Sequence, residues 1–125
     1  MAGTITITKD DRHLLRSGRE IRHIAIDFVC AGGACSADIA AALGESALFG
    51  FLYAITAIGG DADWDLDLHT PDDLDILSGN MEAINVAAGK MYTPAAPIIM
   101  AGEITLEITG ATTTDTGTVE LFIEN

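Results

Sequence analysis

The stretch EITLEITGATTTDTGTVELFIE, residues 103–124, decides the fold, because apolar and polar side chains alternate along both of its ends. Apolar residues occupy every second position of 104–108 and again of 119–123. This period of two is typical of half-buried strands in antiparallel sheets. The segment between them, GATTTDTG (110–117), is rich in turn-forming residues. The sequence therefore predicts two strands joined as a hairpin.

Three earlier segments are also predicted to be strands, two of them by alternation. TITIT (4–8) and EIRHIAIDFVC (20–30) both read as strands, and the second places Ile24, Ile26 and Phe28 on one face. The segment ALFGFLYAITAI (47–58) is apolar on both faces. It is predicted to be either a central strand covered on both sides or a strand whose outer face meets a partner subunit.

Two segments are less regular. SADIAAALGES (36–46) fits a short helix capped by Ser36 and ended by Gly44, and it fits equally a strand of small residues. The segment 80–103 contains two prolines and two glycines, which indicates an irregular crossing with one short strand around Ala83 to Ala87. Helical structure is therefore expected to be minor.

These segments predict a mainly β protein: an antiparallel β-sandwich or jelly roll of about 7–8 strands with at most one short helix. The 125 residues are expected to form a single domain, with 1–22 as a basic N-terminal arm or first hairpin. The start MAGTITIT does not resemble a secretory signal, and no apolar run approaches the length of a membrane span. We expect a soluble protein made in the cytosol.

Charge is distributed unevenly along the chain. The net charge is -13, and only six residues are Lys or Arg, which argues against nucleic acid as a partner. Residues 1–22 contain five of these bases and three acids, whereas the rest has one base and sixteen acids. Such asymmetry suits docking of a basic arm on an acidic neighbour, including another copy of the chain, and it suits a solvated hairpin equally well.

Cys30 and Cys35 are the only cysteines. Two are too few for a disulfide framework, and the C-x4-C spacing lacks the second ligand pair of a structural zinc site. Because disulfides are rare in the cytosol, free packed thiols are expected ahead of a local disulfide or a metal site.

The segment DADWDLDLHT (61–70) carries an acid at every second position, namely Asp61, Asp63, Asp65 and Asp67. An EF-hand loop starting at Asp61 would need glycine at position six, where this chain has Leu66. We predict the solvated face of a strand whose other face is buried, with a surface cation on these four carboxylates as a weaker alternative. The following TPDDLDIL (70–77) is predicted to turn and then to return Leu74, Ile76 and Leu77 to the core.

Catalytic signatures are missing from the sequence. His13, His23 and His69 stand in separate segments, and neither a G-x-S-x-G elbow nor a glycine-rich phosphate loop occurs. Exposed carboxylates do no acid–base work unless burial shifts their pKa values. The sequence predicts a protein that is not an enzyme and has no cofactor.

The succession of GTITIT, YAITAIGGDADWDLDLHTPDDLDIL and AGEITLEITGATTTDTGTVELFIEN resembles small virion proteins of tailed bacteriophages, especially capsid decoration (cement) proteins. The similarity spans most of residues 3–125 and consists mainly of strand alternation and turn residues. The insertion AGGACSADIAAALGES departs from that pattern. The resemblance implies a β-sandwich on the virion capsid surface that stabilises the head. Its implied partners are the major capsid protein and copies of itself, in a trimer or other cluster.

Two other functions fit the sequence: a phage tail, baseplate or head–tail assembly component, and a carbohydrate- or cation-binding β-sandwich. For contacts with a partner the sequence favours the basic residues Arg12, Arg16 and Arg19 and the apolar-strand residues Phe49, Phe51 and Tyr53. The alternative for these aromatic residues is that they fill the core.

Overall fold

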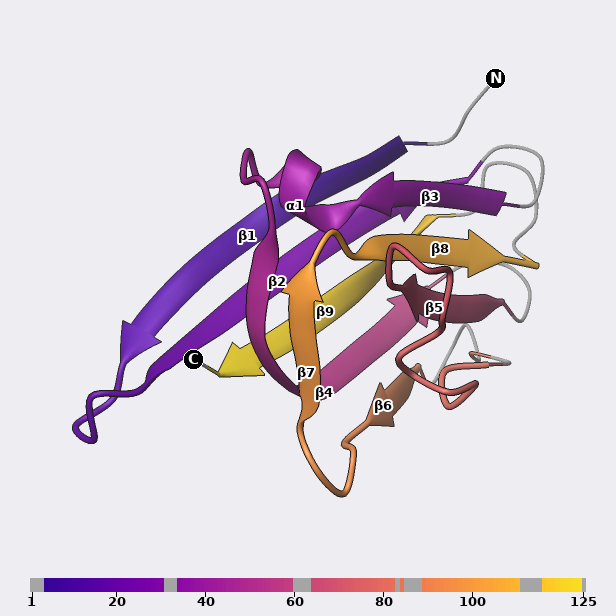
Figure 1. Cartoon of the computed structure of the whole chain (residues 1–125). Coiled ribbons are helices and arrows are strands. Elements are labelled where there is room, and N and C mark those ends of the chain that lie inside the picture. Colours follow the sequence, from indigo (N-terminus) through magenta and orange to yellow (C-terminus); the bar gives the residue numbers. More distant parts are fainter. Residues whose placement is uncertain are drawn as a thin grey trace.

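The chain forms nine β-strands and one short helix in a computed structural model that describes residues 4–30, 34–59, 64–82, 84, 89–110 and 116–124. Every strand pairing in the described residues is antiparallel. The strands form two sheets with their apolar faces together, so the mainly β, antiparallel sandwich expected from the alternation is confirmed (Figure 1). The strands are slightly more numerous than predicted.

The larger sheet has six strands in the order β1-β2-β9-β4-β6, and β7 pairs with the other half of β4. Their bounds are β1 Thr4–Leu14, β2 Glu20–Val29, β4 Leu48–Gly59, β6 Lys90–Tyr92, β7 Ile98–Gly102 and β9 Thr116–Glu124. Strands β1 and β2 form a long hairpin that projects past the rest of the molecule (Figure 1). The N-terminal segment is thus a hairpin integrated into the sheet.

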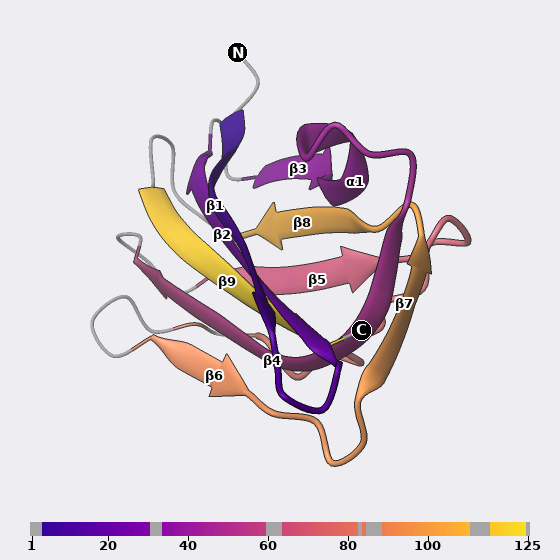
Figure 2. The same cartoon turned by 90° about the vertical axis from the view of Figure 1, so that its left-hand side faces the viewer.

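The smaller sheet has three strands in the order β3-β8-β5, namely β3 Ala34–Asp38, β8 Thr105–Thr109 and β5 Asp65–His69. The larger sheet curves around it, and the first half of β4 turns up beside β7 at one side of the small sheet (Figure 2). A β-bulge at Leu52/Ala54 and the positive φ of Gly50 (144°) lie in this strand. Bulges and glycines are the usual means by which a strand bends.

The predicted terminal hairpin is wrong. Strands β8 and β9 form where the alternation placed them, but β8 lies in the small sheet and β9 lies in the large one. Strand β9 pairs instead with β2 and β4. Alternation determines which side chains of a strand are buried, but it does not determine which strand lies beside it. The apolar faces of β8 and β9 therefore meet across the sandwich, although the two strands do not pair with each other.

One aromatic contact in the core joins Phe28 of the large sheet to Trp64 beside the small one. Their ring centroids lie 4.8 Å apart in an edge-to-face arrangement. The indole N–H of Trp64 donates to the carbonyl of Gly59 at 2.8 Å, which satisfies its polar atom inside the core. Gly117 makes room for this contact, because a Cβ there would lie 2.7 Å from the Phe28 ring. The apolar face predicted for 20–30 is confirmed, since Ile24, Ile26 and Phe28 are fully buried.

Residues 34–46 combine the two structures that the sequence left open. Strand β3 ends at Asp38, and helix α1, Ile39–Ala42, follows at once. The helix cap is Asp38 and not Ser36: the amide N–H of Ala41 donates to the Asp38 carboxylate at 3.3 Å. Gly44 comes after the helix with a φ of 76°, as a terminating glycine does.

The segment after β5 only partly returns to the core. Leu77 and Met81 are fully buried and Ile76 is half-buried, but Leu74 is 66% exposed, contrary to the prediction. Leu74 ends a tight turn, in which the amide of Asp73 donates to the carbonyl of Thr70 and the amide of Thr70 donates to the carbonyl of Leu74. Of the short strand predicted around 83–87, only Ile84 is described, and it forms an isolated bridge with Trp64. The other positions lie outside the described residues.

Cys30 and Cys35 form a disulfide, so the expectation of free thiols is wrong. Cys30 directly follows β2 and Cys35 is the second residue of β3, and both are buried between the sheets. The chain reverses between these strands, which places the two sulfurs together although the sequence context carried no pairing signal. The bond covalently joins the large sheet to the small one.

Arg22 is the only buried charged residue in the described part of the chain. It lies on the inner face of β2, where its guanidinium donates to both carboxylate oxygens of Asp10 at 2.7 Å and also pairs with Glu45. The hydrogen bond from Arg22 holds the pKa of Asp10 below its ordinary value. Three segments are tied together by this cluster: β1, β2 and the connection from α1 to β4.

Replacing Arg22 by Met should lower the free energy of unfolding by about 2–3 kcal/mol, because two carboxylates lose their counterion while the apolar stem is kept. Chemical denaturation monitored by circular dichroism measures the change. Arg16→Met is the matched control, since Arg16 is exposed in the hairpin turn, and it should stay within about 0.5 kcal/mol of the parent protein. Equal stability of the two variants would contradict the role given to Arg22.

Low pH should weaken the contribution of the Arg22 cluster to stability. A carboxylate whose pKa is lowered by folding stabilises the protein fully above its unfolded pKa of about 3.9, and that contribution is lost as pH falls through the folded value. The free energy of unfolding should therefore fall below about pH 4, and Asp10→Asn should flatten this part of the profile. A slope unchanged by Asp10→Asn would show that other carboxylates govern acid unfolding.

Reduction of the disulfide should lower the free energy of unfolding by roughly 2 kcal/mol, the value expected for closure of a short loop. Urea titrations of the parent protein with and without reductant measure the difference. The double variant Cys30→Ala/Cys35→Ala should be insensitive to reductant. An identical urea midpoint for the oxidised and reduced parent protein would contradict a stabilising bond.

Candidate functional site

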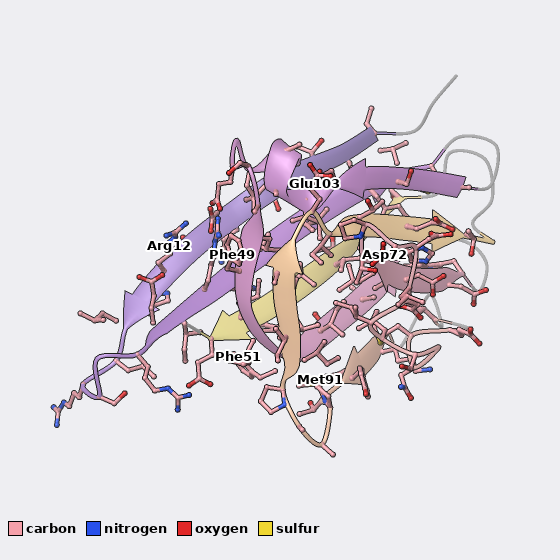
Figure 3. All side chains as sticks on the ribbon, viewed as in Figure 1. Arg12, Phe49, Phe51, Asp72, Met91 and Glu103 are labelled. Carbon is pink, nitrogen blue, oxygen red and sulfur yellow. A yellow bond between two sulfur atoms is a disulfide. The ribbon has the colours of Figure 1, made fainter. Side chains whose placement is uncertain are left out.

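Large apolar side chains gather on the outer face of β4 and β7. Phe49 is 63% exposed, Phe51 is 44% exposed and Ile99, directly opposite Phe51, is 70% exposed. We call these three residues the outer apolar patch; Phe49 and Phe51 are labelled in Figure 3. The alternate residues Leu48 and Leu52 are fully buried on the inner face. Strand β4 is therefore not covered on both sides, and Phe49 and Phe51 do not fill the core.

Strand register connects this patch to the turn end of the β1–β2 hairpin. One row of paired positions crosses the outer face in the order Ile21, Glu124, Phe51, Ile99. The Glu124 carboxylate accepts from the guanidinium Nε of Arg19 at 2.7 Å. Arg19 thus contacts this row through Glu124, and its charge is already paired within the chain.

The other two predicted basic residues are placed differently. Arg12 stands opposite Arg22 in the hairpin register and pairs with Glu45 at 3.3 Å and Glu20 at 3.8 Å, so its side chain lies on the inner side of the hairpin. Arg16 is exposed in the turn at the hairpin tip. The predicted contact residues therefore do not form one continuous surface.

Tyr53 lies in β4, two positions after Phe51, and is half-buried. Its ring centroid is 6.2 Å from that of Phe122, which stacks on His23 at 4.6 Å. Burial, together with the nearby charge of Glu124, raises the pKa of the Tyr53 hydroxyl. These rings extend the apolar character of the outer face from β4 across β9 to β2.

A shallow cleft of about 340 Å³ opens on the same face where β4, β6 and β9 meet. Its lining includes the exposed side chains of Ile58 and Met91 and the charged groups of Lys90 and Glu120. Glu120 is fixed by hydrogen bonds with the Thr56 hydroxyl at 3.2 Å and the His23 ring at 3.1 Å. The cleft thus combines apolar side chains with one oriented carboxylate.

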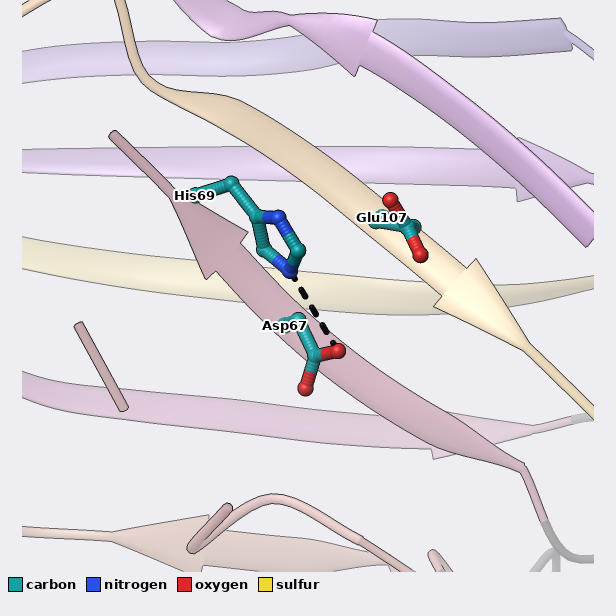
Figure 4. A group of neighbouring side chains, drawn as sticks. All are labelled: Asp67, His69 and Glu107. Carbon is teal, nitrogen blue, oxygen red and sulfur yellow. Dashed lines mark hydrogen bonds and ion pairs between the residues drawn. The ribbon is translucent and has the colours of Figure 1, made fainter. Parts of the chain in front are cut away.

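Of the aspartate ladder, by which we mean the four alternating aspartates of 61–67, only two residues are described. Asp61 and Asp63 lie outside the described residues, whereas Asp65 and Asp67 lie on the outer face of β5, opposite the buried Trp64, Leu66 and Leu68. The predicted strand is confirmed over the described part. Asp67 does not join other ladder residues there: its neighbours are His69 and Glu107, and the ligand atoms of all three lie within 4.8 Å of one another (Figure 4).

The electrostatics of this group are unusual for a solvated strand. Partial burial raises the pKa of Asp67, and the charges of Asp75 and Glu107 add to the effect. The pKa of His69 is raised chiefly by its 2.6 Å hydrogen bond to Asp73. The charge of Glu107 on β8 contributes to both shifts.

His69 and Glu107 were not identified from sequence as companions of Asp67. The alternation that made 65–69 a strand does place His69 on the same face as Asp67, so that signal was present. Glu107 is forty positions after Asp67 and becomes a neighbour only through the β5–β8 register, in which Asp67 faces Glu107. That register could not be read from a single sequence.

Comparisons with known proteins do not identify the chain. No protein-family model matches it, and no curated protein matches it in sequence. In the described residues, none of the helices is of a length and hydropathy that would cross a membrane.

Among solved structures the chain is similar to a low affinity xylan binding module, CBM86, from Roseburia intestinalis, with a TM-score of 0.35 and 9% identity over 97% of this chain and 95% of that one. It is also similar to a protein of unknown function (DUF1255) from Acinetobacter sp. ADP1, with a TM-score of 0.28 and 7% identity over 94% of this chain and 92% of the other. At these TM-scores and identities neither similarity establishes a shared fold or function for this chain.

Proposed function

We propose that this chain is a non-catalytic assembly protein that binds another protein surface through the outer face of its large sheet. The observation that carries the proposal is the outer apolar patch, in which Phe49, Phe51 and Ile99 stand exposed in one register. Apolar side chains clustered on the surface of a folded domain mark interaction sites. Aromatic residues in particular supply much of the binding energy of protein interfaces.

The surroundings of the patch fit a protein partner. Arg19 and Glu124 form an ion pair in the next position of the row, as in interfaces where an apolar centre has a charged rim. Extending outward, Tyr53 and Phe122 are half-buried aromatic residues that could enlarge the contact. An exposed apolar surface of this kind suits repeated contacts in an assembly rather than a small ligand.

The resemblance to capsid decoration proteins suggests the identity of the partner. On this proposal the chain is a structural protein of a phage particle, attached to the outside of the head and stabilising it there by contact with the major capsid protein. A tail or baseplate position would use the same surface. The strongly acidic remainder of the chain agrees with a partner other than nucleic acid.

A second candidate, a carbohydrate-binding β-sandwich, is favoured by the cleft beside Glu120. A fixed carboxylate next to exposed apolar side chains can accept hydrogen bonds from sugar hydroxyls. Against it, the only tryptophan is buried in the core and is unable to stack on a sugar from outside. The assembly function therefore remains the better supported of the two.

Replacing Phe51 by Ser should weaken attachment to purified heads of the source phage more than about tenfold, because truncating an interfacial aromatic anchor costs about 2 kcal/mol. Co-sedimentation of the labelled protein with heads measures the binding. Leu74→Ser is the matched control, since Leu74 is equally apolar and 66% exposed but lies in the turn after β5. It should bind like the parent protein.

Equal binding of the Phe51→Ser and Leu74→Ser variants would contradict the assignment of this surface. A failure of the parent protein to bind heads, together with retardation in gels that contain soluble polysaccharide, would support the second candidate instead. Circular dichroism of each variant establishes that the fold is retained.

A further inference from the structure

We propose that the outer face of the small sheet binds one divalent transition-metal ion of the zinc class through Asp67, His69 and Glu107. Asp67 and His69 are two positions apart on β5, so both point to the same face. Glu107 on β8 stands directly opposite Asp67. The three ligand atoms lie within 4.8 Å of one another, close enough for one ion after small side-chain rotations (Figure 4).

The spacing of the first two ligands already fits a shared ion. His69 Nε2 and Asp67 Oδ2 are 3.4 Å apart. Two ligands that each bind a tetrahedral zinc ion at about 2.0–2.1 Å lie about 3.4 Å from each other. The same separation is long for a direct hydrogen bond, which is shorter than about 3.2 Å in most proteins.

His69 is also held in the orientation that a metal ligand requires. Its Nδ1 lies 2.6 Å from a carboxylate oxygen of Asp73. With Nδ1–H donating to that carboxylate, Nε2 carries the lone pair and faces Asp67. Metal-bound histidines in proteins almost always have such a partner on the second ring nitrogen, which fixes the tautomer and the ring.

Charge supplies the reason for a cation at this place. Two carboxylates directly opposite each other on neighbouring strands repel and destabilise a sheet. The ion pairs that Lys and Arg side chains make in the described residues go to acids of the hairpin, the α1–β4 connection and the end of β9, not to the small sheet. A divalent ion between Asp67 and Glu107 would turn this repulsion into attraction.

The neighbouring acid Asp75 is not counted among the metal ligands. Asp75 accepts hydrogen bonds from the backbone N–H groups of Leu68, Leu77 and Gly79, so its carboxylate is used in closing the turn. The donor set is therefore one imidazole nitrogen and two carboxylate oxygens, with at least one position left for water. This set suits Zn²⁺, whereas Ca²⁺ prefers six to eight oxygen ligands.

This site is independent of the proposed assembly function, because it lies on the other sheet of the sandwich. Isothermal titration of the untagged, chelator-treated chain with ZnCl₂ should give one saturable ion per chain, and CaCl₂ should give none. Asp67→Asn, His69→Gln and Glu107→Gln should each weaken zinc binding at least about tenfold. His13→Gln is the matched control, because His13 is exposed in the hairpin and should bind as the parent does.

Thermal unfolding gives a second readout that separates binding from folding. Glu107→Gln removes the carboxylate pair, so the metal-free variant should unfold at the same temperature as the parent or higher, yet it should lose the zinc-induced rise in Tm. Absence of saturable zinc binding by the parent protein would overturn the proposal. So would binding that survives Glu107→Gln, or binding that His13→Gln removes.

Discussion

The structure depends on one constraint: a six-stranded sheet and a three-stranded sheet must bury their apolar faces against each other. The small sheet cannot cover the whole inner face of the large one, so the large sheet curves around it and other segments cover what is left. The remaining part of the inner face is covered by helix α1, by the buried side chains of Leu77 and Met81 and by the connection from α1 to β4. Where that connection reaches β2, the covering contact is ionic: Arg22 lies on the inner face and Glu45 meets it from the connection.

Much of the fold could be predicted from sequence because alternation is a local property. It located β2, β5, β8 and β9 and identified their buried residues, since each strand needs one apolar face whatever its neighbour. Pairing is not local, and the predicted hairpin of β8 with β9 failed for that reason. Leu74 was assigned to the core by hydrophobicity alone, although a tight turn holds it outside.

The candidate sites divide in the same way. Phe49 and Phe51 were singled out because β4 is apolar on both faces, and the structure places both on its surface. The basic residues were grouped because they are near in sequence, yet Arg12 and Arg19 lie on opposite sides of the hairpin and are paired within the chain. The group of Asp67, His69 and Glu107 required the β5–β8 register, and the Cys30–Cys35 bond required knowledge of how the chain reverses between the two sheets.

The hairpin has a consequence for how copies of this chain could polymerise. In the described residues β1 pairs only with β2, so its other side is a strand edge that could recruit further strands. A bulge at Ile7/Lys9 interrupts this edge, and four consecutive charged residues, Lys9 to Arg12, follow it. Both features discourage the addition of a foreign strand. Open-ended fibres that grow by addition of strands are thereby disfavoured at this edge.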